Sequence, residues 1–544
     1  MGAEYIEFSH AKNGLESHPY NYRSSQNLVE VADAERLRHN AAADLRTTEW
    51  KPGVKEWLVL TCVSLLMTMD AFNATVVLPL VTNLSTTSEQ PLGSALWIEA
   101  TYFLASAASQ SFSAMLAALF GVGPIGLGAA VLATVGTGVC SGSMNLACLV
   151  PGRFIQGMGC GGVLATSLLM IDEVIPCPHQ ARFTGYIFQA RVAGATVGLI
   201  FGGVLIDHAV WAFYISFVFC ALGLLVIPFA VDLRSYKHAP KYKTCELDWQ
   251  GAALTFMGIG CLLIGINWGG TLYDWSNWHV LVLLGAGGAS MLVLVLYEVF
   301  WAVHPIFSSI VFNSIARTML YLGSLLHGFL ISCHILNCSL YLKLVKDLSS
   351  ALEGLSLVTI ASPALLLLIL IENVRLLRSP SLPPWMIRAG WMCSTLATGF
   401  FIILDPATPH QIWVFIFLGM GVGHSLLISG YHKSMHSITS NRKSSSGESS
   451  GRDSGHSSSC ILMYSVLRTW GMCIAVPVSG AIVFNRMLWE VKEGGANSDT
   501  QTGDTSLSEQ GRVQKMMLVH GFHILWRVMV GVSALGGLSS LFVR

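Results

Sequence analysis

Long apolar segments recur along almost the whole chain and constrain its fold more than any other feature. A helix that crosses a bilayer core needs about 20 apolar residues, and fourteen stretches approach that length: 57–82, 97–119, 122–142, 145–171, 184–206, 210–231, 249–268, 278–303, 318–342, 351–372, 385–404, 411–432, 460–484 and 520–542. Only 11% of the 544 residues are charged, against about 25% in soluble proteins. Because the stretches lack the alternation of barrel strands, we expect an all-α integral membrane protein with 14 transmembrane helices.

The distribution of basic residues predicts which side of the membrane each loop faces. When the N-terminus is placed inside, the internal loops hold more than twice as many Lys and Arg residues as the external loops, as the positive-inside rule requires. An even number of spans then puts both termini in the cytoplasm. We expect a multi-pass protein of the plasma membrane, with the vacuolar membrane as the alternative. On the outer face, Asn83 begins an N-glycosylation acceptor sequence.

Three polar segments lie outside the spans. Residues 1–56 form a predicted cytoplasmic tail, whose first 50 residues lack the hydrophobic region of a signal peptide. Residues 437–459 are rich in Ser and Gly and are expected to form a flexible cytoplasmic linker. Residues 485–519 are acidic and rich in Ser, Thr and Gly, and are expected to form an external loop. None of the three is predicted to be a folded domain.

Composition and motifs exclude several classes of protein. Lys plus Arg and Asp plus Glu are equal at 31 each, so no net charge favours nucleic acid. The 13 cysteines contain no CxxC pair, and we expect neither a metal site nor a cofactor. A GxGxxG match at 121–126 lies between two spans, where the strand that precedes this motif in nucleotide-binding folds is missing. Since no Walker motif is present either, we expect neither an ATP-driven protein nor an enzyme.

The fourth predicted span carries a specific motif. The sequence LVPGRFIQGMGCGG (149–162) contains Arg153, Gln156, Gly157 and Gly159. Their order resembles the RxxQGxG motif of drug:proton antiporters in the major facilitator superfamily. On the first span, Asp70 precedes Pro79 by nine residues, which resembles the aspartate motif of the fourteen-span branch. The segment INWGGTLYDW (266–275) is similar to the NWGGxxYxW signature of fungal members.

This resemblance extends from about residue 57 to residue 543 and implies both a fold and an activity. Such transporters hold their substrate near the membrane midplane between two helical bundles that rock to alternate access. We therefore assign 57–231 to an N-terminal six-helix bundle, 232–303 to a cytoplasmic loop and two extra central spans, and 304–544 to a C-terminal six-helix bundle. The implied function is proton-coupled efflux of small organic compounds, such as drugs, toxins or secondary metabolites, by a monomer.

Two departures from the family pattern lie in segments that the resemblance links to the conformational change, the loop between spans 2 and 3 and the fifth span. The loop between spans 2 and 3 usually carries a charged cluster that latches the cytoplasmic side, but LAALFGVGPIGLG has no charge, so other contacts must act there. The fifth span resembles the antiporter motif with its GPxxGG core but lacks the proline. It retains glycines at spacings that let helices pack closely: Gly194, Gly198, Gly202 and Gly203. These glycines serve either helix packing alone or the sliding of the two bundles during transport.

Ionisable residues inside the spans are candidates for function, because each costs at least ~2.5–3.5 kcal/mol on insertion scales. Helical rise places Asp70 and Arg153 at similar depths. We expect them to pair, either as a proton-coupling device that opens when Asp70 is protonated or as a permanent structural ion pair. Arg191 and Arg468 lie at similar depths to each other, and Arg191 either binds an anionic group of a ligand or snorkels to the interface. Glu99 is expected to be an interfacial residue.

Two histidines share one face of the ninth span. His327 and His334 are seven residues apart and therefore lie on the same side of a helix. A proton relay and a hydrogen-bonded packing role are the two interpretations.

Two alternatives to efflux stay open. The first is uptake of a nutrient or an iron-chelate complex, because related fourteen-span branches import. The second is a membrane sensor or scaffold that transports nothing. Export predicts that a deletion strain accumulates more of a fluorescent compound than its parent.

Overall fold

The computed structural model describes residues 50–87, 92–142, 145–230, 248–302, 314–379, 381–446, 454–498 and 507–543. The chain from Val54 onward forms one compact unit, whereas most of the predicted tail, 1–49, lies outside the described residues. The long helices are α2 (Val54–Thr75), α3 (Leu78–Thr87), α5 (Trp97–Phe120), α6 (Val122–Gly142), α7 (Leu146–Val174), α8 (Cys177–Val204), α9 (Ala209–Ala230), α10 (Trp249–Trp268), α11 (Trp278–Phe300), α12 (Ile315–Leu344), α13 (Ser350–Asn373), α14 (Pro383–Phe400), α15 (His410–Ser446), α16 (Ser454–Ser498) and α17 (Leu507–Ser540).

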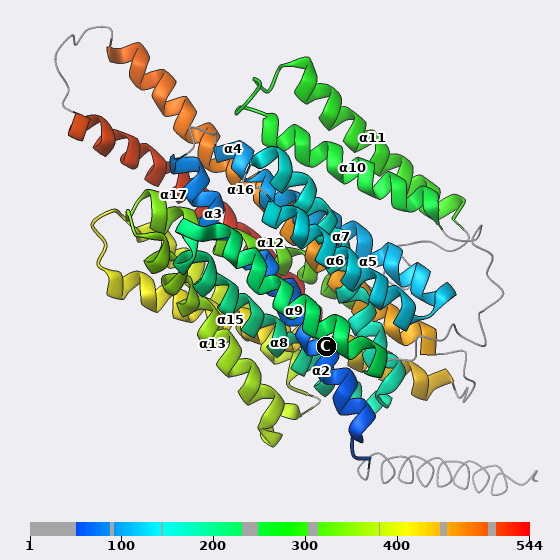
Figure 1. Ribbon diagram of the computed structural model, residues 1–544. Helices are drawn as coiled ribbons and strands as arrows, with labels where there is room; N and C mark the ends of the chain where they lie inside the picture. Colours follow the sequence, from blue (N-terminus) through cyan, green and yellow to red (C-terminus); the bar gives the residue numbers. More distant parts are fainter. Residues whose placement is uncertain are drawn as a thin grey trace, which may run out of the picture. The chain divides into compact units, whose positions relative to one another are not determined.

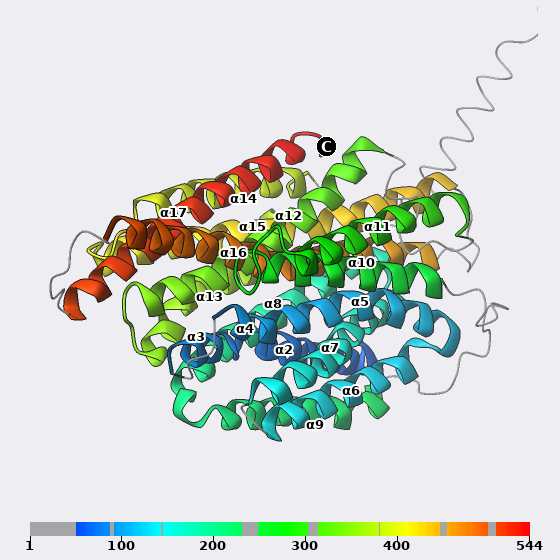
Figure 2. The same cartoon turned by 90° about the horizontal axis from the view of Figure 1, so that it is seen from above.

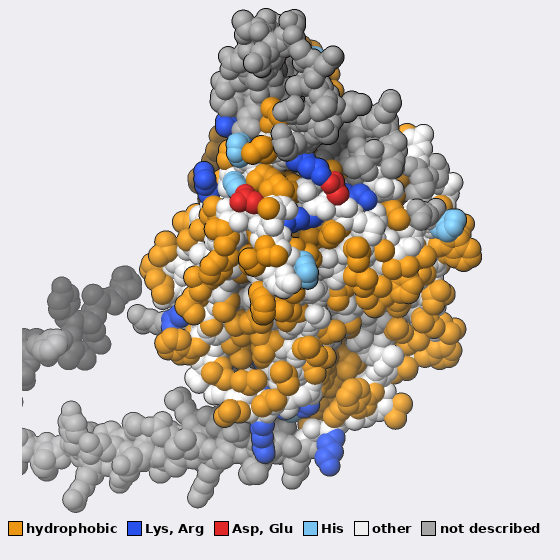
Figure 3. All heavy atoms as spheres, turned by 90° about the vertical axis from the view of Figure 1, so that its left-hand side faces the viewer, with side chains coloured by type: hydrophobic (Ala, Val, Ile, Leu, Met, Phe, Trp, Pro, Cys, Tyr) orange, Lys and Arg blue, Asp and Glu red, His pale blue; other side chains and the backbone are white. Residues whose placement is uncertain are grey.

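Fourteen helical segments within these ranges are long and apolar enough to cross a membrane, which confirms the predicted number of spans. Their outer surface is apolar as well: in the most hydrophobic window of α11 only 17% of the residues are buried. Figure 3 shows hydrophobic side chains over most of one face, with Lys and Arg mainly towards its upper and lower margins. Such a surface is stable in lipid rather than in water, so the chain is a multi-pass integral membrane protein.

The helices pack in two sets. The N-terminal helices, α2 to α9, contact one another chiefly through the pairs α6–α7, α5–α7 and α2–α8, and the C-terminal helices, α12 to α17, through α12–α16 and α14–α15. The two sets meet where α8 lies against α13 and where α5 lies against α16. Helices α10 and α11 pair with each other, and α10 also contacts α16 and α5; Figures 1 and 2 show this pair side by side.

Glycines lie where helices approach most closely. A Cβ atom added to Gly194 would lie 2.3 Å from the carbonyl oxygen of Thr68 in α2, and one added to Gly202 would lie 2.3 Å from that of Val76, directly after α2. Gly203 brings α8 equally close to Ser350 at the start of α13. The remaining predicted glycines have comparably short contacts, made by α7 against α5 and α6 and by α8 against α2: Gly157, Gly159 and Gly198. A side chain at these positions would force the helices apart.

Two local breaks shape the first spans. Helix α2 ends at Thr75 and α3 begins at Leu78, because Pro79 has no N–H to donate to the turn before it. Between α5 and α6 the connection is a single residue, Gly121, with φ of 94°, a backbone region that favours glycine. The connection between spans 2 and 3 is therefore a single glycine, with a helix directly on either side of it.

Two predicted loops are shorter than expected. Helix α15 continues through Ser446 and α16 begins at Ser454, so much of the 437–459 linker is helical. Helices α16 and α17 likewise continue into 485–519, as far as Ser498 and from Leu507. Extending an existing helix adds one hydrogen bond for each residue that is fixed, so polar sequence next to a span adopts helix more readily than its composition predicts.

Candidate binding cavity

A cavity of about 110 Å³ lies between the two sets of helices. Most of its wall consists of Ala, Val, Leu, Ile, Phe and Met side chains from both sets. Five polar residues also line it, three from the N-terminal helices and two from the C-terminal helices: Thr75, Glu99 and Arg191, and Ser332 and Arg468. The cavity can therefore hold an apolar compound beside a few charged groups.

One ion pair joins α2 to α8 at the edge of the cavity. Asp70, which is 0% exposed, has its Oδ2 atom 3.0 Å from Nε of Arg191. The Tyr102 hydroxyl donates a hydrogen bond of 2.8 Å to Oδ1 of the same carboxylate. Oδ2 itself accepts no hydrogen bond of normal geometry, so charge attraction alone links it to Arg191. Protonation of Asp70 would therefore release this contact.

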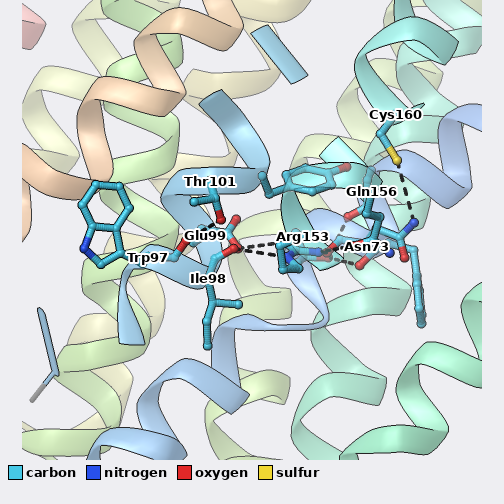
Figure 4. A network of polar contacts seen from close by, with 12 residues as sticks. Asn73, Trp97, Ile98, Glu99, Thr101, Arg153, Gln156 and Cys160 are labelled. Carbon is cyan, nitrogen blue, oxygen red and sulfur yellow. Dashed lines mark hydrogen bonds and ion pairs between the residues drawn. The ribbon is translucent and has the colours of Figure 1, made fainter. Parts of the chain in front are cut away.

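A second ion pair is more extensively hydrogen bonded (Figure 4). Arg153 of α7 is fully buried, and its Nη2 lies 3.1 Å from Oε2 of Glu99 on α5. Its Nη1 donates to the Gln156 side chain at 2.7 Å and to the Asn73 carbonyl at 2.8 Å. Its Nε donates to the Ile98 carbonyl at 3.2 Å. The guanidinium of Arg153 thus has partners on three helices, α2, α5 and α7.

The predicted pair between Asp70 and Arg153 does not form, because each residue has a different partner. Tyr102 lies between them, with its hydroxyl on Asp70 and its ring 4.2 Å from the guanidinium carbon of Arg153. Equal depth therefore did not imply contact, since depth says nothing about which helices face each other. Glu99, which was expected to be an interfacial residue, is 2% exposed, because its side chain lies against Arg153 beside the cavity.

Arg468 differs from the other two arginines. It is 5% exposed and lines the cavity from α16. Among the described residues no carboxylate lies within ion-pair distance of it, and its Nε donates no hydrogen bond. Its guanidinium carbon lies 5.9 Å from the ring centre of Phe188. Arg468 therefore carries a buried charge that forms no ion pair with a described carboxylate.

The two predicted histidines belong to a chain of three. His424 of α15 lies between them, with Nε2 at 3.0 Å from Nδ1 of His334 and Nδ1 at 3.3 Å from Nε2 of His327. The other ring nitrogen of His334 lies 3.0 Å from the Thr398 hydroxyl. All three rings are buried. The sequence offered no signal for His424, because it lies in a different apolar span with no fixed spacing to the other two.

Polar contacts also join the two sets of helices. Gln110 of α5 bonds through its amide group to the hydroxyls of Thr469 and Ser465 on α16. At the end of the bundle where α2 begins, His436 of α15 contacts the Thr184 hydroxyl of α8 at 3.0 Å. Nearby, within the C-terminal set, Glu372 of α13 lies 3.0 Å from Nζ of Lys433 on α15. The contact between His436 and Thr184 joins the two sets at that end, where the loop between α5 and α6 carries no charge.

Two other expectations concern sites away from the cavity. Across the described ranges, no group of three or more His, Cys, Asp and Glu side chains is arranged to hold a metal ion. Asn83 lies within helix α3, and its glycosylation remains a prediction.

A helical membrane protein with fourteen spans and a cavity between two sets of six belongs to the class of membrane transporters. The model of one family, the Major Facilitator Superfamily, matches residues 60–449. The chain is therefore a member of the major facilitator superfamily, and it is a transporter of small molecules rather than an enzyme.

Curated relatives come from fungi. The chain is 24% identical to MFS transporter L2 of Phoma sp. over 83% of its own length and 74% of that protein. It is 26% identical to efflux pump FUS6 of Gibberella fujikuroi over 69% and 67% of the two chains, and 22% identical to MFS efflux transporter aclA of Aspergillus oryzae over 89% and 88%. Among solved structures, that of the human organic anion transporter MFSD10 has a TM-score of 0.56 at 14% identity, covering 90% of this chain and 100% of that one. At this identity the likeness concerns the fold alone.

Proposed function

We propose that this transporter exports small, largely apolar organic compounds, such as drugs, toxins or secondary metabolites, in exchange for protons. Export is supported by the curated relatives, several of which are named as efflux pumps. The mostly apolar cavity wall supports a hydrophobic substrate. The excess of Lys and Arg in one set of loops supports cytoplasmic termini. We further propose that it acts as a monomer in the plasma membrane.

The contact between Asp70 and Arg191 is the observation that carries proton coupling. It joins α2 to α8 by charge attraction, and α8 is also the helix that packs against α13 of the other set. Adding a proton to Asp70 removes its charge and so weakens the hold of α2 on α8. Since α8 forms one of the two seams between the sets, proton binding would alter the interface that must open and close during transport.

The experiment is transport in proteoliposomes with and without a pH gradient, screened over a panel of apolar fluorescent compounds. We expect the gradient to increase transport by the wild-type protein and to have no effect on Asp70→Asn. Asp347→Asn is the matched control, because Asp347 is an exposed loop aspartate with positive φ, a conformation that Asn also tolerates. A gradient effect of wild-type size in Asp70→Asn would contradict the coupling role.

Direction is tested separately, in cells. A deletion strain should accumulate more of any compound that the proteoliposomes identify as a substrate, and re-expression should reverse the effect. Lower accumulation in the deletion strain would indicate uptake instead.

A further inference from the structure

The charges on the cavity wall do not cancel. Glu99 is paired with Arg153, and Arg191 is paired with Asp70. Arg468 is the remaining charged residue on the wall, and none of the described carboxylates pairs with it. With both pairs ionised, the cavity therefore carries one uncompensated positive charge, contributed by the C-terminal helices.

An unpaired guanidinium at this depth is costly. Removing an ion from water costs several kcal/mol in real proteins unless a partner offsets the cost, and ionisable residues inside membrane spans typically mark substrate or ion pathways. The neighbouring groups Phe188 and Tyr464 do not supply one: Phe188 offers only a ring at 5.9 Å, and the Tyr464 hydroxyl, one turn earlier on α16, interacts with Arg468 but carries no negative charge. The negatively charged partner of Arg468 is therefore expected to be a ligand that enters the cavity.

The chemistry of the guanidinium selects the partner. Its planar fork of N–H donors matches the two oxygens of a carboxylate, and charge-assisted bonds of this kind are about twice as strong as neutral ones. Apolar residues such as Ile331, Ile335 and Met472 line the cavity with Arg468. We infer that the cavity binds compounds that carry a carboxylate on an apolar body, with the carboxylate held by Arg468.

A cationic substrate is the competing idea, because Glu99 also lines the cavity. Its carboxylate is already bound by Arg153, whose guanidinium is held in place by three further hydrogen bonds. A cation would have to break that pair, whereas an anion meets Arg468 without breaking any. This inference rests on the proposed function only in taking the cavity as the substrate site.

The test is equilibrium binding to the purified full-length protein in lipid nanodiscs, without any gradient. The probes are 1-naphthaleneacetate, its neutral amide 1-naphthaleneacetamide, and the cation 1-naphthylmethylammonium, with empty nanodiscs to subtract partition into lipid. We expect the acid to bind about tenfold more tightly than the amide or the cation, because a hydrogen bond to a charged group contributes that much or more.

Variants identify the residue that recognises the acid. Arg468→Gln should remove the preference for the acid while leaving the affinity for the amide within about twofold, and Arg468→Lys should restore part of it because the charge returns. Arg527→Gln is the matched control, since Arg527 is an exposed arginine of the C-terminal helices. A preference that survives in Arg468→Gln overturns the inference. Equal binding of acid and amide, tighter binding of the cation, or no binding of any probe also overturns it.

The outcome is separable from that of the proposed function. Gradient-driven transport of neutral compounds without a preference for the acid would overturn this inference and leave export standing. A preference for the acid that depends on Arg468, together with transport that ignores the pH gradient, would support this inference and contradict proton coupling.

Discussion

The two walls of the cavity bury polar groups in different ways. In the N-terminal helices both buried arginines, Arg191 on the wall and Arg153 behind it, have a carboxylate partner, and Arg153 has three further hydrogen bonds. On the C-terminal side, Arg468 has no such partner in the described part of the chain, and three histidine rings in a row are buried in the same set of helices. Charges that form ion pairs within the protein hold helices together, whereas a charge without such a partner is available to bind a ligand.

This difference can be tested through the free energy of unfolding of arginine variants. Replacing a paired buried arginine leaves its carboxylate without compensation, which is strongly destabilising. Replacing a buried arginine without a carboxylate partner among the described residues removes a charge that no ion pair compensates. The same substitution is therefore expected to have opposite effects on the free energy of unfolding at the two walls.

The largest effect is expected for Arg153→Gln. Glu99 would remain buried and lose its partner, and the Asn73 and Ile98 carbonyls would lose their donor. We expect the protein to be destabilised by about 3–5 kcal/mol, measured by unfolding of the purified protein in detergent. The double variant Glu99→Gln with Arg153→Gln should be less destabilised than Arg153→Gln alone. Equal losses would show that the ion pair is not the reason.

A smaller effect is expected for His424→Ala. It removes the central ring of the chain, so that one nitrogen of His334 and one of His327 lose their contacts. Leaving buried polar groups unsatisfied costs about 1–3 kcal/mol. His410→Ala is the control on the same helix, because His410 is exposed. If the three histidines relay protons, His424→Ala should also reduce gradient-driven transport in proteoliposomes. Unchanged transport would leave packing as the role of His424.

The smallest effect, and the one of opposite sign, is expected for Arg468→Gln in the absence of ligand. We expect the free energy of unfolding to rise, by on the order of 1 kcal/mol, because an uncompensated buried charge is removed. Unfolding under the same conditions as for Arg153→Gln checks this. Destabilisation as large as that of Arg153→Gln would erase the difference between the two walls.

Hydropathy was sufficient to predict the spans, because lipid allows few ways to satisfy the backbone. Partner choice was not predictable in the same way. Asp70 and Arg153 were placed at equal depth, but contact also depends on which helices are neighbours and on which side each residue faces. Tyr102 and His424 illustrate the same limit, since an aromatic ring or a histidine in an apolar span has no sequence signal that names its partner.

Glu99 shows that the place of a residue along a span does not predict its surroundings. Its assignment to the interface followed from its closeness to Trp97 at the start of the predicted second span. In the structure, its side chain lies against Arg153 of α7 and lines the cavity. The motif residue Arg153 was recognised, but its acidic partner was not.

The ion pairs of the N-terminal helices also bear on how the chain is made. Both acidic residues are synthesised before their arginines. Glu99 precedes Arg153 by 54 residues, and Asp70, on the first span, precedes Arg191 by 121 residues. At about 5–20 residues per second, Asp70 remains without its arginine for roughly ten seconds. The Tyr102 hydroxyl, carried on the second span, is the first of its two side-chain partners to arrive. In order of synthesis, therefore, Asp70 meets its neutral partner on the second span well before its charged partner on the fifth.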